Sequence, residues 1–214
     1  MYEEIINQAL DYVKKIFESD YSGHDYFHTL RVFKMATHIA TVENADLKTV
    51  QLAALLHDVD DIKLSPQTHA EKINARHFLA ANNFSETAIC KICQIIEEIS
   101  YVGKDSVTPK TLEGKCVQDA DRLDALGAVG IARTFAYGGS HNRLMYHPDI
   151  KPKMNMGKEE YINHVSTSVN HFYEKLFNLT ELINTPTAKK IATEREAYMK
   201  NFIAEFMDEW DGIK

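Results

Sequence analysis

Two of the ten histidines in this 214-residue chain lie beside charged residues in a way that predicts chemistry. His28 precedes Arg31 by three residues, so on a helix that starts near Asp25 the imidazole and the cation share one face. His57 and Asp58 follow a stretch that is almost wholly apolar. Burying a polar group without a partner costs on the order of 1–3 kcal/mol, and one divalent cation satisfies both side chains of such a pair. These residue types predict a metal ion beside a bound anion.

A third acidic cluster, with Asp119, Asp121 and Asp124, lies further along the chain. On a helix, Asp121 and Asp124 fall in one stripe with Val117 and Ala128, and this mainly apolar stripe is costly for a carboxylate without a cation. Helical bundles build metal sites from such inward-facing residues on separate helices. Two imidazoles and two carboxylates suit Mn²⁺, Fe²⁺, Co²⁺, Ni²⁺ or Zn²⁺. One divalent ion is expected, with Mn²⁺ favoured and Mg²⁺ also considered, because a six-coordinate ion keeps positions for water and a phosphate oxygen.

The order of these clusters resembles the HD-domain superfamily of metal-dependent phosphohydrolases. His28, the adjacent pair His57 and Asp58, and the distant Asp121 match its pattern, and Ala120–Leu123 resembles its last motif, which favours Asp121 over the neighbouring acids. The whole chain is similar to a bacterial subgroup of about this length. The segments that carry this similarity are Gly23–His28, Asp119–Gly127 and His171–Leu176.

The resemblance implies an all-helical fold and hydrolysis of phosphate esters or anhydrides, usually of nucleotides. Relatives in the subgroup are nucleoside triphosphate pyrophosphohydrolases, so pyrophosphate release from a nucleoside triphosphate is the leading expectation. Cleavage of a nucleoside monophosphate or a cyclic nucleotide is the alternative reaction. A nucleotide sensor with a structural metal is the alternative of another class.

The resemblance also implies that an acid three residues after Asp58 assists the reaction, and that residue is Asp61. Asp61 is expected to accept the proton of the attacking water, directly or through a second water, although the family more often has the longer Glu there. This acid argues against the sensor, because a binding protein needs no general base. Lys63 is expected to be catalytic and, with Arg31, to neutralise phosphate charge.

Five further residues complete the predicted site. Asp124, Arg122 and Arg133 are expected to contact the substrate, Asp124 through a ribose hydroxyl or by orienting a ligand. His24 and Asp25 are expected to support the ligating histidines, which usually donate their second ring N–H to a carboxylate or carbonyl.

Composition excludes several other classes of protein. The chain has 24 Lys plus Arg against 31 Asp plus Glu and a net charge of −7, whereas nucleic-acid binding usually needs a basic surface. The longest apolar run, Leu52–Leu56, is far shorter than the ~20 residues of a membrane span. Residues 1–4 lack the pattern of a signal peptide, and three cysteines fit a reducing cytoplasm. The expected protein is cytoplasmic, monomeric or homodimeric, and binds neither nucleic acid nor membrane.

Helical periodicity predicts one all-α domain over residues 1–214, with a core at about 20–135 and C-terminal helices at about 158–211 packed on it. Ser65 and Pro66 predict a helix start, with backbone N–H groups as an anion site. The segment 137–157 is expected to be irregular and, with Arg143, Lys151 and Lys153, to cover a polyphosphate. The expected helices lie at about 2–18, 25–43, 46–58, 65–81, 85–99, 112–135, 158–180 and 187–211.

Two other groups favour ordinary structural roles. Cys90 and Cys93 lie one turn apart on an amphipathic helix, where core packing is the better interpretation than half of a zinc site. His69 is the candidate for a second metal ion, an interpretation that the sequence supports only weakly.

Overall fold

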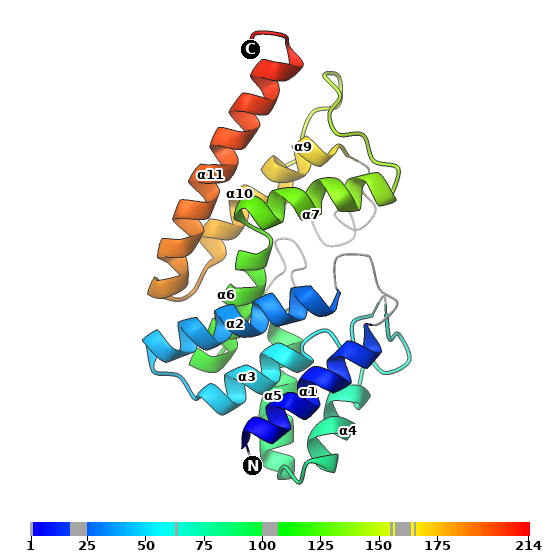
Figure 1. Cartoon of the computed structure of the whole chain (residues 1–214), viewed down its shortest axis with the longest axis vertical. Helices are drawn as coiled ribbons and strands as arrows, with labels where there is room; N and C mark the ends of the chain where they lie inside the picture. The colour runs from blue at the N-terminus through cyan, green and yellow to red at the C-terminus, as the bar shows by residue number, and fades with distance from the viewer. Residues whose placement is uncertain are drawn as a thin grey trace. The chain divides into compact units, whose positions relative to one another are not determined.

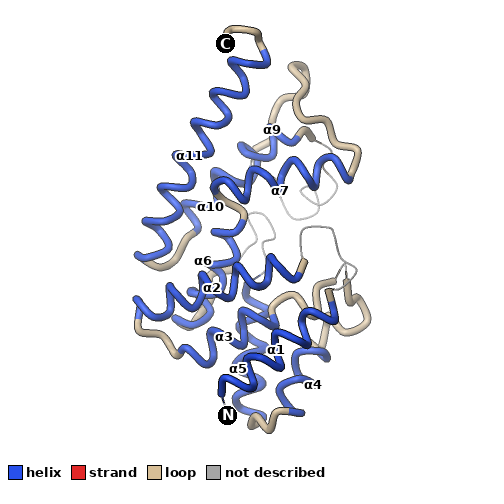
Figure 2. The backbone as a smooth tube through the Cα atoms, viewed as in Figure 1, coloured by secondary structure: helices blue, strands red, loops and turns tan. Residues whose placement is uncertain are grey.

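The computed structural model describes residues 2–17, 25–62, 64–99, 107–154, 156, 164 and 166–214. Within this part of the chain every regular element is a helix and no strand occurs, which confirms the predicted all-α fold (Figure 2). None of the described helices is long and apolar enough to cross a membrane. The chain divides into two compact units, one within residues 1–100 and 107–121 and the other from residue 122 to the end. The arrangement of both units as one domain stays a prediction.

The first unit is built around α3 (Leu47–Leu56), which packs against α1, α2 and α5 (Figure 1). Leu52, Leu55 and Leu56 are fully buried, and burial of each such side chain contributes roughly 1.5–3 kcal/mol. The almost wholly apolar stretch before His57 is therefore a central buried helix of this unit. The other helices of this unit are α1 (Tyr2–Ile16), α2 (Tyr26–Glu43), α4 (Ile73–Ala81), α5 (Glu86–Ile99) and α6 (Leu112–Asp124), whose last residues belong to the second unit.

The predicted start of the fourth helix at Ser65 and Pro66 is wrong. Residues 66–72 form turns, and α4 begins only at Ile73, after Lys72 with a left-handed φ of 52°. The cap comes from elsewhere, because the buried carboxylate of Asp60 accepts the backbone N–H groups of Asn74 at 3.1 Å and Ala75 at 3.0 Å. No helix starts at residue 66, so the anion site expected from the backbone N–H groups of such a start does not form there.

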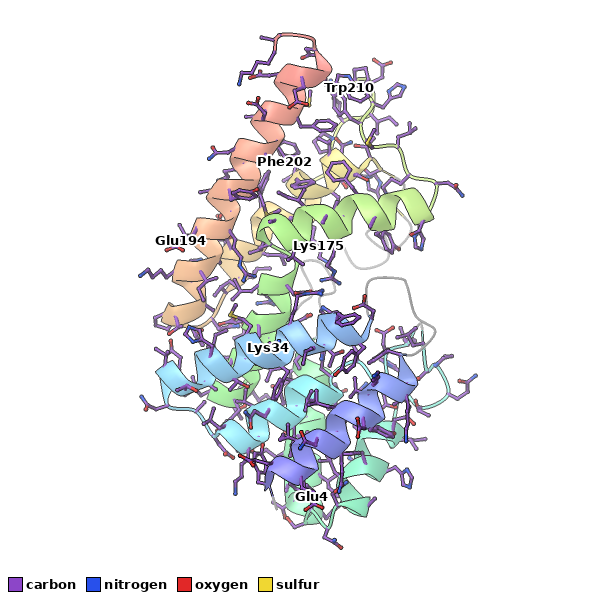
Figure 3. The ribbon with its side chains drawn as sticks, viewed as in Figure 1. Glu4, Lys34, Lys175, Glu194, Phe202 and Trp210 are labelled. Atoms are coloured by element: carbon purple, nitrogen blue, oxygen red, sulfur yellow. The ribbon has the colours of Figure 1, made fainter. Side chains whose placement is uncertain are left out.

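The second unit contains α7 (Gly127–Ser140) and α11 (Pro186–Trp210), which pack against each other (Figure 1). Figure 3 shows the side chain of Phe202 on the inner side of α11, where its ring lies 6.0 Å from that of Phe135 on α7. Phe172 and Phe206 extend this aromatic core. Four short elements lie between the two long helices: α9 (Ser168–His171), a π-helix (Phe172–Leu176), α10 (Phe177–Leu179) and a 3₁₀ helix (Thr180–Leu182).

The helix expected to run from about 112 to 135 is interrupted between α6 and α7. Gly127 has a φ of 73°, in the left-handed region that other residues rarely adopt, and the aliphatic part of Arg195 lies against it. After the interruption α7 continues to Ser140, so the expected irregular segment begins four residues later than predicted. Position 138 of α7 requires glycine, because the Cβ of any other residue would lie 2.2 Å from Ser168 Oγ.

The helix expected over about 158–180 begins, within the described residues, at Ser168. Thr167 is extended, and its hydroxyl accepts the backbone N–H of Asn170 at 3.1 Å, which caps the new helix. Glu174, buried in the π-helix, accepts hydrogen bonds at one carboxylate oxygen from the backbone N–H of Lys153 at 3.0 Å and from Ser166 Oγ at 2.8 Å. This carboxylate therefore joins two distant points of the second unit.

Candidate metal centre

The first predicted ligand, His28, lies in the first turn of α2. Asp25 is the N-cap of this helix, and its side chain accepts the backbone N–H of His28 at 2.7 Å. Such a cap contributes roughly 1 kcal/mol and fixes the point at which the helix starts. His28 is only 1% exposed, so its imidazole faces the interior of the first unit. The role expected for Asp25, support of a ligating imidazole, stays a prediction.

His57 and Asp58 follow directly after the last residue of the buried helix α3. Nδ1 of His57 donates to the carbonyl oxygen of Ala54 at 2.8 Å, since a carbonyl only accepts. Nδ1 therefore carries a proton, and in the neutral ring the lone pair of Nε2 points to the other side. The chain turns at His57, which brings Oδ2 of Asp58 within 3.2 Å of that nitrogen.

The fourth predicted ligand, Asp121, comes from α6. Its Oδ1 lies 3.4 Å from Nε2 of His28 and 3.9 Å from Nε2 of His57. Oδ2 of Asp58 in turn lies 3.4 Å from Nε2 of His28. The fold of the first unit thus brings together the two histidines and two aspartates that the sequence singled out.

The spacing of these atoms suits a single ion. Ligand atoms at about 2.1 Å from one ion lie about 3.0 Å apart in an octahedron and about 3.4 Å apart in a tetrahedron. The nitrogen–oxygen distances here run from 3.2 to 3.9 Å, and the possible ligand atoms of His28, His57 and Asp58 all lie within 4.8 Å of one another. The donor set is the mixture of imidazole and carboxylate that first-row divalent ions accept.

The charges in the cluster act on one another. Burial would lower the pKa of His57, but the carboxylates of Asp58 and Asp121 outweigh it and raise that pKa above its usual value. Burial would raise the pKa of Asp121, but a hydrogen bond to His28 and the charge of His57 lower it below the usual value. Both shifts have the same cause, which is the attraction between the imidazoles and the carboxylates of the cluster.

The segment after Asp58 is tied down by its own backbone. The N–H of Asp61 donates to the carbonyl of Asp58 at 3.0 Å, and the carbonyl of Asp61 accepts from Ser65 at 2.7 Å. Nδ1 of His69 bonds to the backbone carbonyl of Asp60 at 2.8 Å, so this ring nitrogen is used in the structure of the turn. Asp61 itself is partly buried, three residues after a predicted ligand.

The remaining predicted residues are placed as follows. Arg31 lies partly buried on α2, one turn after His28. Lys63 and His24 lie outside the described residues. The roles assigned to all three stay predictions.

Three residues predicted to contact the substrate lie in the second unit, where they form hydrogen bonds or ion pairs with other residues of that unit. Nη1 of Arg133 forms an ion pair with Oδ2 of Asp124 at 2.6 Å, and Asp124 is buried. Arg122 donates to the backbone carbonyl of Leu182. These contacts link α6 to later segments, and contact of the three residues with a substrate stays a prediction.

Two residues of the first unit escaped the sequence reasoning. Asp60 was grouped with its acidic neighbours, although it is the one that caps α4, and nothing in its local sequence marks that role. Phe27, in the first turn of α2, is 63% exposed, which its residue type does not indicate.

Comparison with known proteins agrees with this geometry. A family model of the HD domain matches residues 25–126, the range that contains all four clustered residues. YpgQ of Bacillus subtilis, an uncharacterized protein, is 35% identical over 208 residues, which cover 96% of this chain and 94% of YpgQ. This chain belongs to the HD-domain superfamily.

Solved structures support the same assignment over the whole length. A protein from Lactobacillus plantarum superposes with a TM-score of 0.86 at 38% identity, covering 98% of both chains. An HD-superfamily hydrolase from Bacillus thuringiensis gives a TM-score of 0.79 at 42% identity, covering 99% of both chains. YpgQ in complex with ADP gives a TM-score of 0.76 at 33% identity, covering 98% of this chain and all of YpgQ. The protein is therefore an HD-type hydrolase of phosphate esters or anhydrides.

Proposed function

We propose that this protein is a metal-dependent nucleotide phosphohydrolase that releases pyrophosphate from nucleoside triphosphates. The observation that carries the proposal is the cluster of His28, His57 and Asp58, whose donor set and spacing suit one divalent ion. Asp121 lies beside it, with Oδ1 3.4 Å from Nε2 of His28. The complex of YpgQ with ADP supports a nucleotide as the substrate, because that relative binds an adenine nucleotide. The similarity to an HD-superfamily hydrolase from Bacillus thuringiensis over the full chain supports the enzymatic rather than the sensor interpretation.

The four clustered residues would hold the ion, with Mn²⁺ as the favoured identity. A bound divalent ion polarises a phosphoryl oxygen and lowers the pKa of water, so that a nucleophile exists near neutral pH. Nδ1 of His57, held by Ala54, keeps the ring in the tautomer whose Nε2 faces the cluster. The bond to Ala54 thus orients the ligating nitrogen of His57. The cap from Asp25 fixes the backbone from which the side chain of His28 extends.

Asp61 is the residue that would take the proton from the attacking water. Its backbone is fixed to Asp58 by a bond of 3.0 Å, so its position relative to the ligands is set by one short turn. The aspartate side chain is one methylene shorter than the glutamate more common in this family, so a second water extends its reach where needed. Arg31 and Lys63 would neutralise the phosphates, since phosphoryl transfer depends on positioning and charge neutralisation.

The test is a product assay on metal-stripped protein that has been reloaded with Mn²⁺ and given a panel of nucleotides. Phosphorus NMR that detects pyrophosphate and a nucleoside monophosphate supports the proposal. Inorganic phosphate from monophosphates, or opening of a cyclic nucleotide, would replace it with the alternative reaction. Tight nucleotide binding without turnover would replace it with the sensor.

The role of Asp61 is tested separately from metal binding. Asp61→Asn should lower kcat by about 10²–10⁴-fold while the protein still binds one ion per chain, because the amide is no base. Retained turnover in this variant would remove Asp61 from the mechanism and leave the metal centre intact. Metal content measured by elemental analysis separates the two effects.

A further inference from the structure

The first turn of α2 exposes an aromatic ring directly beside a buried metal-binding histidine. Phe27 is 63% exposed, while His28 is 1% exposed. Among the described residues of the first unit, Phe27 is the most exposed large apolar side chain, and Ile62 at 57% is the second. Single exposed apolar residues are common on proteins. Here, however, each of the two precedes or follows a residue proposed for the site, since Phe27 precedes His28 and Ile62 follows the proposed base Asp61.

The order of side chains along this turn matches the order of parts in a nucleotide. Phe27 and Arg31 are four residues apart on one face of α2, and His28 and Arg31 are three apart, so the arginine is a neighbour of both. A flat apolar ring, a guanidinium and a metal-binding imidazole therefore follow one another over little more than one turn. A nucleotide presents a flat base at one end and anionic phosphates at the other.

We propose that Phe27 stacks on the base of the nucleotide whose phosphates lie at Arg31 and the metal centre, with Ile62 as a second apolar contact. The inference rests on the proposed function and adds to it the place where the base binds. Tyr26 helps to hold the ring, because the two rings meet edge to face with centroids 5.5 Å apart and an interplanar angle of 68°. An aromatic platform accepts every base through its π-face, so this subsite predicts weak discrimination between bases.

The experiment measures binding with and without a base. Isothermal titration of the Mn²⁺-loaded protein compares an α,β-methylene nucleoside triphosphate, which resists cleavage at the bond in question, with inorganic tripolyphosphate, which has no base. Phe27→Ala should weaken binding of the nucleotide about 5- to 150-fold and leave binding of tripolyphosphate unchanged, since stacking acts on the base alone. Phe27→Trp should restore nucleotide affinity, because it offers a larger ring.

The matched control is Tyr198→Ala, which removes another aromatic that is 56% exposed, on α11 of the second unit. This substitution should change the affinity for neither the nucleotide nor tripolyphosphate. Unchanged nucleotide affinity in Phe27→Ala, or equal losses for nucleotide and tripolyphosphate, would overturn the inference and leave the proposed function in place. Wild-type protein that binds neither ligand and releases no pyrophosphate would overturn the proposed function and the inference with it.

Discussion

Binding of a divalent ion should raise the thermal stability of this protein, and the rise should depend on Asp58. The proposed ligands come from α2, the end of α3 and α6, so an ion would join three segments that are far apart in the sequence. The unfolded chain cannot present all four ligands together, and the ion therefore stabilises the native state. Differential scanning fluorimetry of metal-free protein, titrated with Mn²⁺, measures the effect.

The magnitude follows from the linkage between binding and folding. An ion present at 100 times its Kd adds about 2.7 kcal/mol to the free energy of unfolding. For a chain of 214 residues, 1 kcal/mol shifts Tm by about 2–4 °C, so the expected rise is about 5–10 °C. Oδ2 of Asp58 lies within 3.4 Å of both ligating nitrogens, so this one oxygen takes part in two of the closest approaches in the cluster.

Asp58→Asn removes the charge and keeps the shape of the side chain, so it should reduce the metal-dependent rise to less than about 2 °C. Two controls isolate the effect: Asp11→Asn removes an exposed acid of α1, and His38→Gln removes an exposed histidine of α2. Both variants should show the same metal-dependent rise in Tm as the wild type. A full rise in Asp58→Asn, or no rise in the wild type with any of the first-row divalent ions, would refute the assignment of the centre.

Three further predictions concern the rest of the molecule. Asp60→Ala leaves two backbone N–H groups of α4 without their acceptor, so urea denaturation should give a free energy of unfolding lower by about 2–4 kcal/mol. In native protein at pH 8 a thiol reagent should label the exposed Cys90 rapidly and the other two cysteines slowly, because burial raises the pKa of Cys116 to about 12 and that of Cys93 above its usual value. Desolvation and the charges of nearby cations lower the pKa of His171 to about 3, so only the unfolded chain takes up this proton below pH 6.5, and stability should fall by about 1.4 kcal/mol per pH unit towards pH 3.

Each of these has a result that would count against it. A loss below about 0.5 kcal/mol in Asp60→Ala would mean that α4 does not depend on this cap. Equal labelling rates for all three thiols in native protein would contradict the burial of two of them. The acid sensitivity should be smaller in His171→Gln than in the wild type, with stability compared at pH 7, 6 and 5. Parallel losses in the two proteins would assign the effect to other groups.

The candidate ligands could be found from the sequence because each one breaks a local pattern. His57 and Asp58 end a buried apolar helix, and Asp121 interrupts an apolar stripe, so their cost without a cation is visible in the sequence itself. The start of a helix could also be predicted from the sequence where a side chain next to the helix caps it, as Thr185 does for α11. In these cases the determining interaction is local.

The errors arose where a residue distant in sequence determined the local structure. Ser65 and Pro66 have the residue types of a helix start, but the cap of α4 comes from Asp60, fourteen residues before Asn74. At Gly127 the side chain of Arg195 from α11 lies 3.0 Å from where a Cβ would be. The pattern of residue types contains no information on such contacts, because they exist only in the folded chain.

The five residues from His57 to Asp61 hold two proposed ligands, the cap of α4 and the proposed base. Each role depends on the number of residues that separate it from the others, since one added or deleted residue would turn every following side chain to another direction. This segment should therefore have a fixed length, even where individual residues can be exchanged.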